Sequence, residues 1–219
     1  MAFDLEEQEK IDRLKAWWER WGNLLSGLIL VILLAILGWY GWNWYQSYQT
    51  RNALAYYDIV NSTYKSKDEA SLRRLQEANQ ILQDKYSANV YAGRAALLAA
   101  RAYADKGDDA QAEAELQRVL DAANKHPELQ GAAKLQLATL YTNQEKYDSA
   151  FSLLTQDVSG YEALFADKRG DIYFAQGELK SALEQWSQAI QTAGVSAEFI
   201  QTVQFKLNVL GGVNEQPQS

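Results

Sequence analysis

The stretch Gly170-Asp-Ile-Tyr-Phe-Ala-Gln-Gly-Glu-Leu-Lys-Ser-Ala-Leu-Glu-Gln-Trp-Ser-Gln-Ala189 decides the fold of this chain. Its small and large residues are spaced as two closely packed antiparallel helices require. The small Gly170 lets the helices approach each other, while Tyr173 and Trp186 fill the space between them. Gly177 relaxes the turn that joins them, because glycine adopts backbone conformations that other residues avoid. The stretch is therefore expected to form a helix–turn–helix unit.

Similar units occur twice more upstream. Each has a tyrosine, a small residue three positions before it, an alanine nine positions after it and a large apolar residue four positions after the alanine. These residues are Ala100, Tyr103, Ala112 and Leu116, then Ala138, Tyr141, Ala150 and Leu154, then Gly170, Tyr173, Ala182 and Trp186. The tyrosines lie 38 and 32 residues apart. The pattern resembles the tetratricopeptide repeat, a helix–turn–helix of about 34 residues.

The turn position of the three units is not uniform. Gly107 and Gly177 follow the first and third tyrosines by four residues, whereas the second unit has Glu145 there. With this one departure, the sequence predicts three tetratricopeptide-like helix pairs over residues 93–195, stacked as a right-handed solenoid.

The segments on either side of the repeats also read as helices. Residues 46–92 are rich in alanine, leucine, glutamine and tyrosine without the repeat signature, and they predict atypical N-terminal helices. Residues 196–219 predict a capping helix and a tail, because a solenoid needs atypical ends to cover its exposed apolar faces. Strand periodicity is missing from the sequence. The expected fold class is all-α, with about nine helices after residue 50.

An uncharged apolar run precedes these helices. Residues 21–50 contain no Asp, Glu, Lys or Arg, and their core, residues 24–37, consists mostly of leucine and isoleucine. About 20 apolar residues suffice to cross a bilayer as a helix. Tryptophans and tyrosines follow the run in place of the small residues of a signal cleavage site, and they are typical of a membrane interface. The sequence predicts a transmembrane signal anchor over residues 21–45 rather than a soluble core helix or a cleaved signal peptide.

The distribution of positive charge predicts the orientation of this anchor. Four basic residues lie close before it and two follow within counting range, namely Lys10, Arg13, Lys15 and Arg20 against Arg51 and Lys65. Positive charge near a span is retained in the cytoplasm. Residues 1–20, an amphipathic segment, are therefore expected in the cytoplasm, and the rest of the chain across the membrane. In a bacterium this means the inner membrane and the periplasm.

Composition argues against several classes of function. The chain of 219 residues has no cysteine, one histidine and a formal net charge of −7. Without thiols it forms no disulfide or thiolate metal site, and an acidic chain does not suit nucleic acid. His126 stands alone, and no glycine-rich phosphate loop is present. We expect no enzyme activity, no metal and no cofactor.

The complete layout resembles the YfgM family, ancillary subunits of the SecYEG translocon in Gram-negative bacteria. The most specific stretches are residues 15–22 before the anchor, Ala166-Asp-Lys-Arg-Gly-Asp171 in the last repeat and Gln204-Phe-Lys-Leu-Asn-Val-Leu210 near the end. The resemblance implies partners among SecYEG translocon subunits, exported polypeptides and periplasmic chaperones such as PpiD. It also implies a role in passing exported proteins to those chaperones, and some members of the family are linked to envelope stress signalling.

The usual groove positions of the tetratricopeptide repeat can be transferred to this chain. They fall on the first helix of each pair and form a candidate protein-binding groove. These positions are Arg94, Arg101, Thr139, Asn143, Asp167 and Asp171.

Two other functions compete with the export role. One is a periplasmic scaffold for envelope assembly or stress signalling that does not act at the translocon. The other is a hydrolase, which would require a pocket with two convergent carboxylates of raised pKa.

Overall fold

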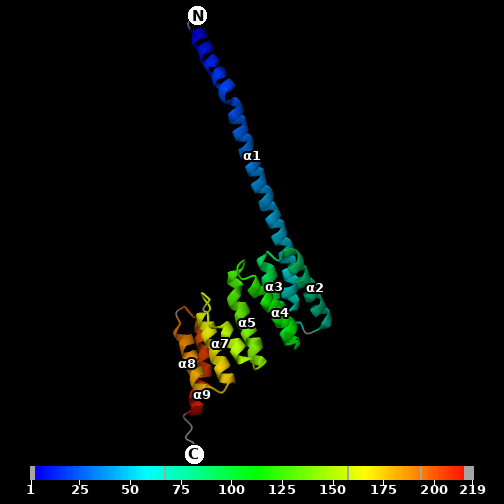
Figure 1. Cartoon of the computed structure of the whole chain (residues 1–219), viewed down its shortest axis with the longest axis vertical. Coiled ribbons are helices and arrows are strands. Elements are labelled where there is room, and N and C mark those ends of the chain that lie inside the picture. Colours follow the sequence, from blue (N-terminus) through cyan, green and yellow to red (C-terminus); the bar gives the residue numbers. More distant parts are fainter. Residues whose placement is uncertain (1–2, 67, 157, 193, 215–219) are drawn as a thin grey trace, which may run out of the picture. The chain divides into compact units, whose positions relative to one another are not determined.

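The computed structural model describes residues 3–66, 68–156, 158–192 and 194–214. Within these ranges the chain forms nine α-helices and one short 3₁₀ helix and contains no β-strand (Figure 1). The prediction of an all-helical fold is confirmed. The chain divides into two compact units, Met1–Arg51 and Asn52–Ser219.

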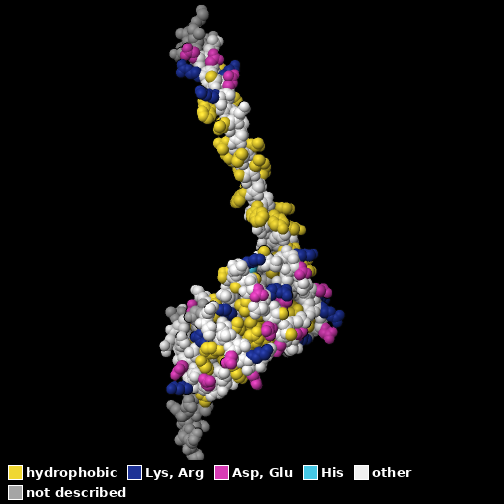
Figure 2. All heavy atoms as spheres, in the orientation of Figure 1, with side chains coloured by type: hydrophobic (Ala, Val, Ile, Leu, Met, Phe, Trp, Pro, Cys, Tyr) yellow, Lys and Arg dark blue, Asp and Glu magenta, His cyan; other side chains and the backbone are white. Residues whose placement is uncertain are grey.

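The first unit consists of most of one long helix, α1 (Phe3–Thr63). Part of α1 is long and apolar enough to cross a membrane, and none of its most apolar stretch is buried. Its exposed side chains include Leu30, Val31, Leu37 and Trp39, and Figure 2 shows apolar side chains covering this part of the helix. Helix α1 continues without a break past residues 20 and 45. The domain limits expected at these residues therefore do not coincide with helix ends.

The second unit contains the end of α1 and the shorter helices. Their bounds are α2 (Glu69–Tyr86), α3 (Val90–Asp105), α4 (Asp109–Asp121), the 3₁₀ helix η1 (Pro127–Leu129), α5 (Gln130–Asn143), α6 (Tyr147–Leu153), α7 (Glu162–Ala175), α8 (Leu179–Gln191) and α9 (Ala197–Asn214). Polar side chains cap several of them, because the first amides of a helix have no partner inside it. Asp68 accepts from the Ser71 amide at 2.8 Å, and Asp108 accepts from the Gln111 amide at 3.2 Å.

Consecutive helices of this unit pack as pairs. Helix α3 packs on α4, α5 on α6 and α7 on α8, while α9 packs on α8. The first helices of the pairs also contact one another, α3 with α5 and α5 with α7. The described parts of the second helices α4, α6 and α8 make no comparable contacts among themselves. The first helices thus form a closely packed inner row, and the second helices form a more widely spaced outer row.

The residues that define the repeat lie where the pairs pack. Ala138, Ala150 and Ala182 have no exposed surface, and Ala100 and Ala112 are 1% exposed. Tyr103 and Trp186 are buried, whereas Tyr141 and Tyr173 are partly buried against neighbouring clusters. A Cβ atom on Gly170 would lie 2.5 Å from Cδ1 of Trp186, so only glycine fits beneath this indole.

The turns inside the three pairs share one geometry. In each, the amide five residues after the repeat tyrosine donates to the tyrosine carbonyl oxygen, at 2.9 Å from Asp108, Lys146 and Glu178. The residue before each of these amides has a left-handed backbone, with φ of 78° at Gly107, 60° at Glu145 and 81° at Gly177. Glycine adopts this conformation without strain. At Glu145 the fold imposes it on a residue with a side chain.

Candidate protein-binding site

Three of the six predicted groove residues lie together. Arg101 on α3 and Thr139 and Asn143 on α5 line one hollow of about 380 Å³, which we call the inner hollow. Gln136 and Asp105 also line it. The inner hollow lies between α3 and α5, and Ala112 and Leu116 of α4 also line it.

Contacts between α4 and α5 fix the walls of the inner hollow. The Tyr141 hydroxyl donates to Oε1 of Glu113 at 2.7 Å, and the Gln144 amide donates to Asp109 at 3.0 Å. Burial, together with the bond to Glu113, raises the pKa of Tyr141 to about 12, so its hydroxyl stays protonated and continues to donate. The Thr139 hydroxyl donates to the Leu135 carbonyl at 2.8 Å, and its oxygen can still accept a hydrogen bond.

The chemistry of the inner hollow suits a peptide. A guanidinium, a hydroxyl and two amide side chains supply both donors and acceptors, which is what the backbone of an extended segment requires. The guanidinium of Arg101 is exposed and adds a positive charge for carboxylates.

Arg94 lies apart from these three residues. It is exposed on α3, and its guanidinium stands over the Tyr91 ring at 5.8 Å from the ring centroid. It is not among the residues that line the inner hollow. Its membership of the groove stays a prediction.

Asp167 and Asp171 on α7 hold the last helix. Nζ of Lys206, on α9, lies 2.7 Å from Oδ1 of Asp167 and 2.6 Å from Oδ1 of Asp171. The Trp186 indole N–H lies 3.2 Å from both the Asp167 carbonyl oxygen and Oδ1 of Asp171. We call these four residues the α9 latch. Its two carboxylates contact α9, which covers this part of the α7 surface.

The α9 latch is a charge-assisted cluster. Burial alone would lower the pKa of Lys206, but the hydrogen bonds to both carboxylates outweigh it and raise that pKa. The amine therefore stays charged. The two carboxylates converge as a hydrolase would require, yet a lysine bridges them, which is typical of a structural ion pair. Within the described residues there is no group of three or more metal-ligating side chains.

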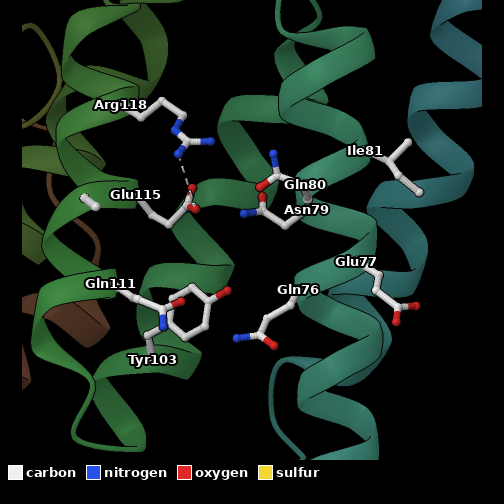
Figure 3. A pocket seen from close by; sticks show the side chains of 10 residues that line it. Gln76, Glu77, Asn79, Gln80, Ile81, Tyr103, Gln111, Glu115 and Arg118 are labelled. Carbon is white, nitrogen blue, oxygen red and sulfur yellow. Dashed lines mark ion pairs between the residues drawn. The ribbon is translucent and has the colours of Figure 1, made fainter.

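A second hollow, which the sequence patterns did not indicate, lies between α2 and α4. We call it the outer hollow; its volume is about 780 Å³, and Figure 3 shows Glu115 of α4 facing Asn79 of α2 across it. Burial raises the pKa of Glu115, while Arg118 and the Asn79 amide act in the opposite direction. One signal could have revealed it: Glu115 interrupts the apolar stripe formed by Ala112, Leu116 and Val119.

Comparison with known proteins adds a family to this geometry. A family model described as a tetratricopeptide repeat-like domain matches residues 15–212. The ancillary SecYEG translocon subunit of Neisseria gonorrhoeae is 30% identical over 211 residues, covering 96% of this chain and all of that protein. The subunit of Haemophilus influenzae is 30% identical, over 96% of this chain and 100% of that protein. The subunit of Escherichia coli is 26% identical, over 93% of this chain and 96% of that protein. No solved structure matches.

Proposed function

The chain belongs to the YfgM family of ancillary SecYEG translocon subunits, and from this premise we propose that it acts at the translocon as a membrane-tethered interaction protein. In this role it helps to transfer exported polypeptides to periplasmic chaperones of the PpiD kind. One observation carries the proposal: the match to the family runs through both the apolar helix and the repeats, so relatives share the tether together with the binding domain.

Membrane attachment allows weak binding to be sufficient for this role. A domain fixed beside a channel meets each emerging chain at a high effective concentration, which reaches the millimolar range for short flexible links. The anchor in α1 supplies the attachment. The inner hollow supplies a surface of matching character, since exposed donors and acceptors such as Arg101 and Asn143 bind backbone without demanding one sequence.

The proposed orientation places the second unit outside the cytoplasm. It rests on the excess of lysine and arginine before the apolar stretch of α1. Protease added to spheroplasts should digest the second unit and leave a protected fragment that contains the first residues of α1. If the whole chain were protected and digested only after lysis, the second unit would lie on the cytoplasmic side instead.

Co-purification from membranes tests the association with the translocon. Full-length protein, extracted in mild detergent, should bring SecYEG subunits with it. A control with residues 21–45 replaced by an unrelated apolar span of equal length separates the contribution of the anchor sequence from that of membrane attachment. Purification without SecYEG subunits, but with proteins of envelope assembly or stress signalling, would favour the competing scaffold function.

The transfer step needs a separate measurement. If the inner hollow receives exported polypeptides, the double substitution of Arg101 and Asn143 by alanine should reduce cross-linking to a chain arrested during export. Co-purification with SecYEG should remain unchanged, because the anchor is intact. Equal cross-linking in the variant and the wild type would remove the inner hollow from the proposal.

A further inference from the structure

The outer hollow lies on a different surface from the predicted groove. It opens between α2 and α4, whereas the inner hollow is lined by α3, α5 and the Ala112 and Leu116 side of α4. Both α2 and α4 pack on α3, and their described residues make no helix-to-helix contact comparable to those pairings. The separation leaves about 780 Å³ of open space.

A carboxylate stands in this space without a full set of partners. The side chain of Glu115 is 11% exposed, and its Oε1 lies 3.9 Å from Nη2 of Arg118. Its Oε2 is buried and has no hydrogen-bond partner among the described residues. A buried acceptor without a donor costs free energy, and a charged one costs more than a neutral one. The fold therefore keeps an acidic group with one oxygen that lacks a donor.

Neighbouring side chains hold the carboxylate in place. Asn79 is 3% exposed, and its Oδ1 accepts from the Gln83 amide at 3.2 Å. Gln83 in turn donates to the Ala92 carbonyl at 2.9 Å, which ties α2 to α3. This chain of bonds directs the Asn79 amide group towards Glu115, as Figure 3 shows.

The rest of the lining combines apolar side chains, among them Ile81 and Ala114, with further acceptors. Gln76, Gln80 and Gln111 contribute amide groups, and Figure 3 shows Glu77 of α2 with its carboxylate directed away from Glu115. Figure 3 shows Tyr103, from α3, with its hydroxyl at the side that faces α2. Arg118 supplies positive charge at one end of the hollow, where its side chain is 44% exposed.

We propose that the outer hollow binds a lysine or arginine side chain presented by an extended segment of another polypeptide. A cationic donor is the group that Oε2 of Glu115 lacks, and a charge-assisted hydrogen bond is stronger than a neutral one. The amide side chains around it pair with the backbone on either side of the basic residue.

The hollow has room for the residues that flank the basic one. A neighbouring hollow of about 330 Å³ shares Gln80 and Arg118 with it and extends to Ser87 at the end of α2. From Gln76 to Ser87 a helix rises about 16 Å, the length of about five extended residues. This binding site does not depend on the translocon, so its failure would leave the proposed function intact.

Peptide binding to the full-length protein in detergent tests the proposal. The probes are fluorescein-labelled, capped pentapeptides, Ala-Ala-Lys-Ala-Ala and the same peptide with glutamine in place of lysine, followed by fluorescence anisotropy. Wild-type protein should bind the lysine peptide about tenfold more tightly than the glutamine peptide. Glu115→Gln, which keeps the shape of the side chain and removes its charge, should abolish that preference.

Two further variants make the result specific. Ala114→Trp fills the mouth of the hollow and leaves the carboxylate in place. This variant should bind the lysine peptide about tenfold more weakly than the wild type does. Glu184→Gln removes the same charge from the exposed surface of α8 and should change nothing. Thermal melting checks that each variant is folded. Equal binding of the two peptides by the wild type, no binding of either, or an unchanged preference in Glu115→Gln would overturn the proposal.

Discussion

Replacing Gly170 by alanine tests the packing on which the repeat depends. At an exposed helix position this change stabilises a protein by about 1 kcal/mol, because alanine favours the helix. Here the new Cβ would stand 2.5 Å from Cδ1 and 2.6 Å from Nε1 of Trp186. Carbon atoms pack at about 3.5–4.0 Å, so the ring must move by about 1 Å.

The surroundings of the indole set the magnitude. Trp186 is 3% exposed, packs against Phe174 and donates to the Asp167 carbonyl, so it has little freedom to move. Overpacking of this kind costs about 1–3 kcal/mol, and a lost hydrogen bond adds about 1 kcal/mol. After the helix-propensity gain is subtracted, we expect Gly170→Ala to lower the free energy of unfolding by about 1–3 kcal/mol.

Urea unfolding of the full-length protein in detergent, followed by far-ultraviolet circular dichroism, measures this change. The same substitution in a Trp186→Leu background supplies the control, because leucine removes the ring atoms that the new Cβ meets. There Gly170→Ala should be neutral or stabilising. Stabilisation in the wild-type background, or an equal loss in both backgrounds, would refute the packing account.

Three other substitutions follow from the structure. Glu115→Gln should stabilise the protein by about 1 kcal/mol or more at neutral pH, since it removes a buried charge on a carboxylate with one oxygen that lacks a donor. Because the pKa of Glu115 is raised, the folded state holds its proton more tightly, and urea midpoints should show this gain shrinking as the pH falls towards 4.5. Lys206→Met should cost about 2 kcal/mol and speed amide hydrogen exchange in α9, because it removes the cation that Asp167 and Asp171 share and leaves Asp171 only Lys168, at 3.4 Å. Glu145→Gly should raise the melting temperature by relieving a left-handed backbone, a gain of about 0.5–1 kcal/mol.

Each of these has a contrary outcome. If Glu115→Gln remained more stable than the wild type at acidic pH, the stabilisation would not come from removing the charge. Unchanged exchange in α9 of Lys206→Met would show that apolar contacts alone hold the helix. A loss on replacing Glu145 would mean that its side chain contributes more than the strained backbone costs.

The repeat architecture was predictable because it depends on local periodicity. Small residues at Ala100, Ala138 and Gly170 and the alanines nine positions after each tyrosine are determined by how closely two neighbouring helices approach. The turn at Glu145 was visible as a departure, and the structure shows that its backbone follows the glycine turns nonetheless. The long apolar helix was equally evident, since a long segment without charged residues is rarely anything other than a membrane-spanning helix.

The candidate site was predictable only in part. Arg101, Thr139 and Asn143 meet because neighbouring first helices pack side by side, which the repeat implies. The bond of Lys206 to Asp167 and Asp171 joins positions 39 and 35 residues apart, and it depends on where the last helix packs. No local spacing encodes that position.

The outer hollow escaped prediction for a different reason. It exists because α2 and α4 both pack on α3 without packing on each other, and spacing within one helix does not encode the distance between two others. A charged residue on a buried stripe, Glu115, was the one sign that the sequence offered.

Site-specific photo-cross-linking in intact cells tests the central claim most directly. Probes placed in the apolar part of α1, at Leu30 or Leu37, and at Arg101 in the inner hollow report on the tether and on the binding surface separately. The account predicts cross-links from α1 to a SecYEG subunit and from Arg101 to exported chains or periplasmic chaperones. Cross-links from both positions to unrelated envelope proteins alone would contradict it.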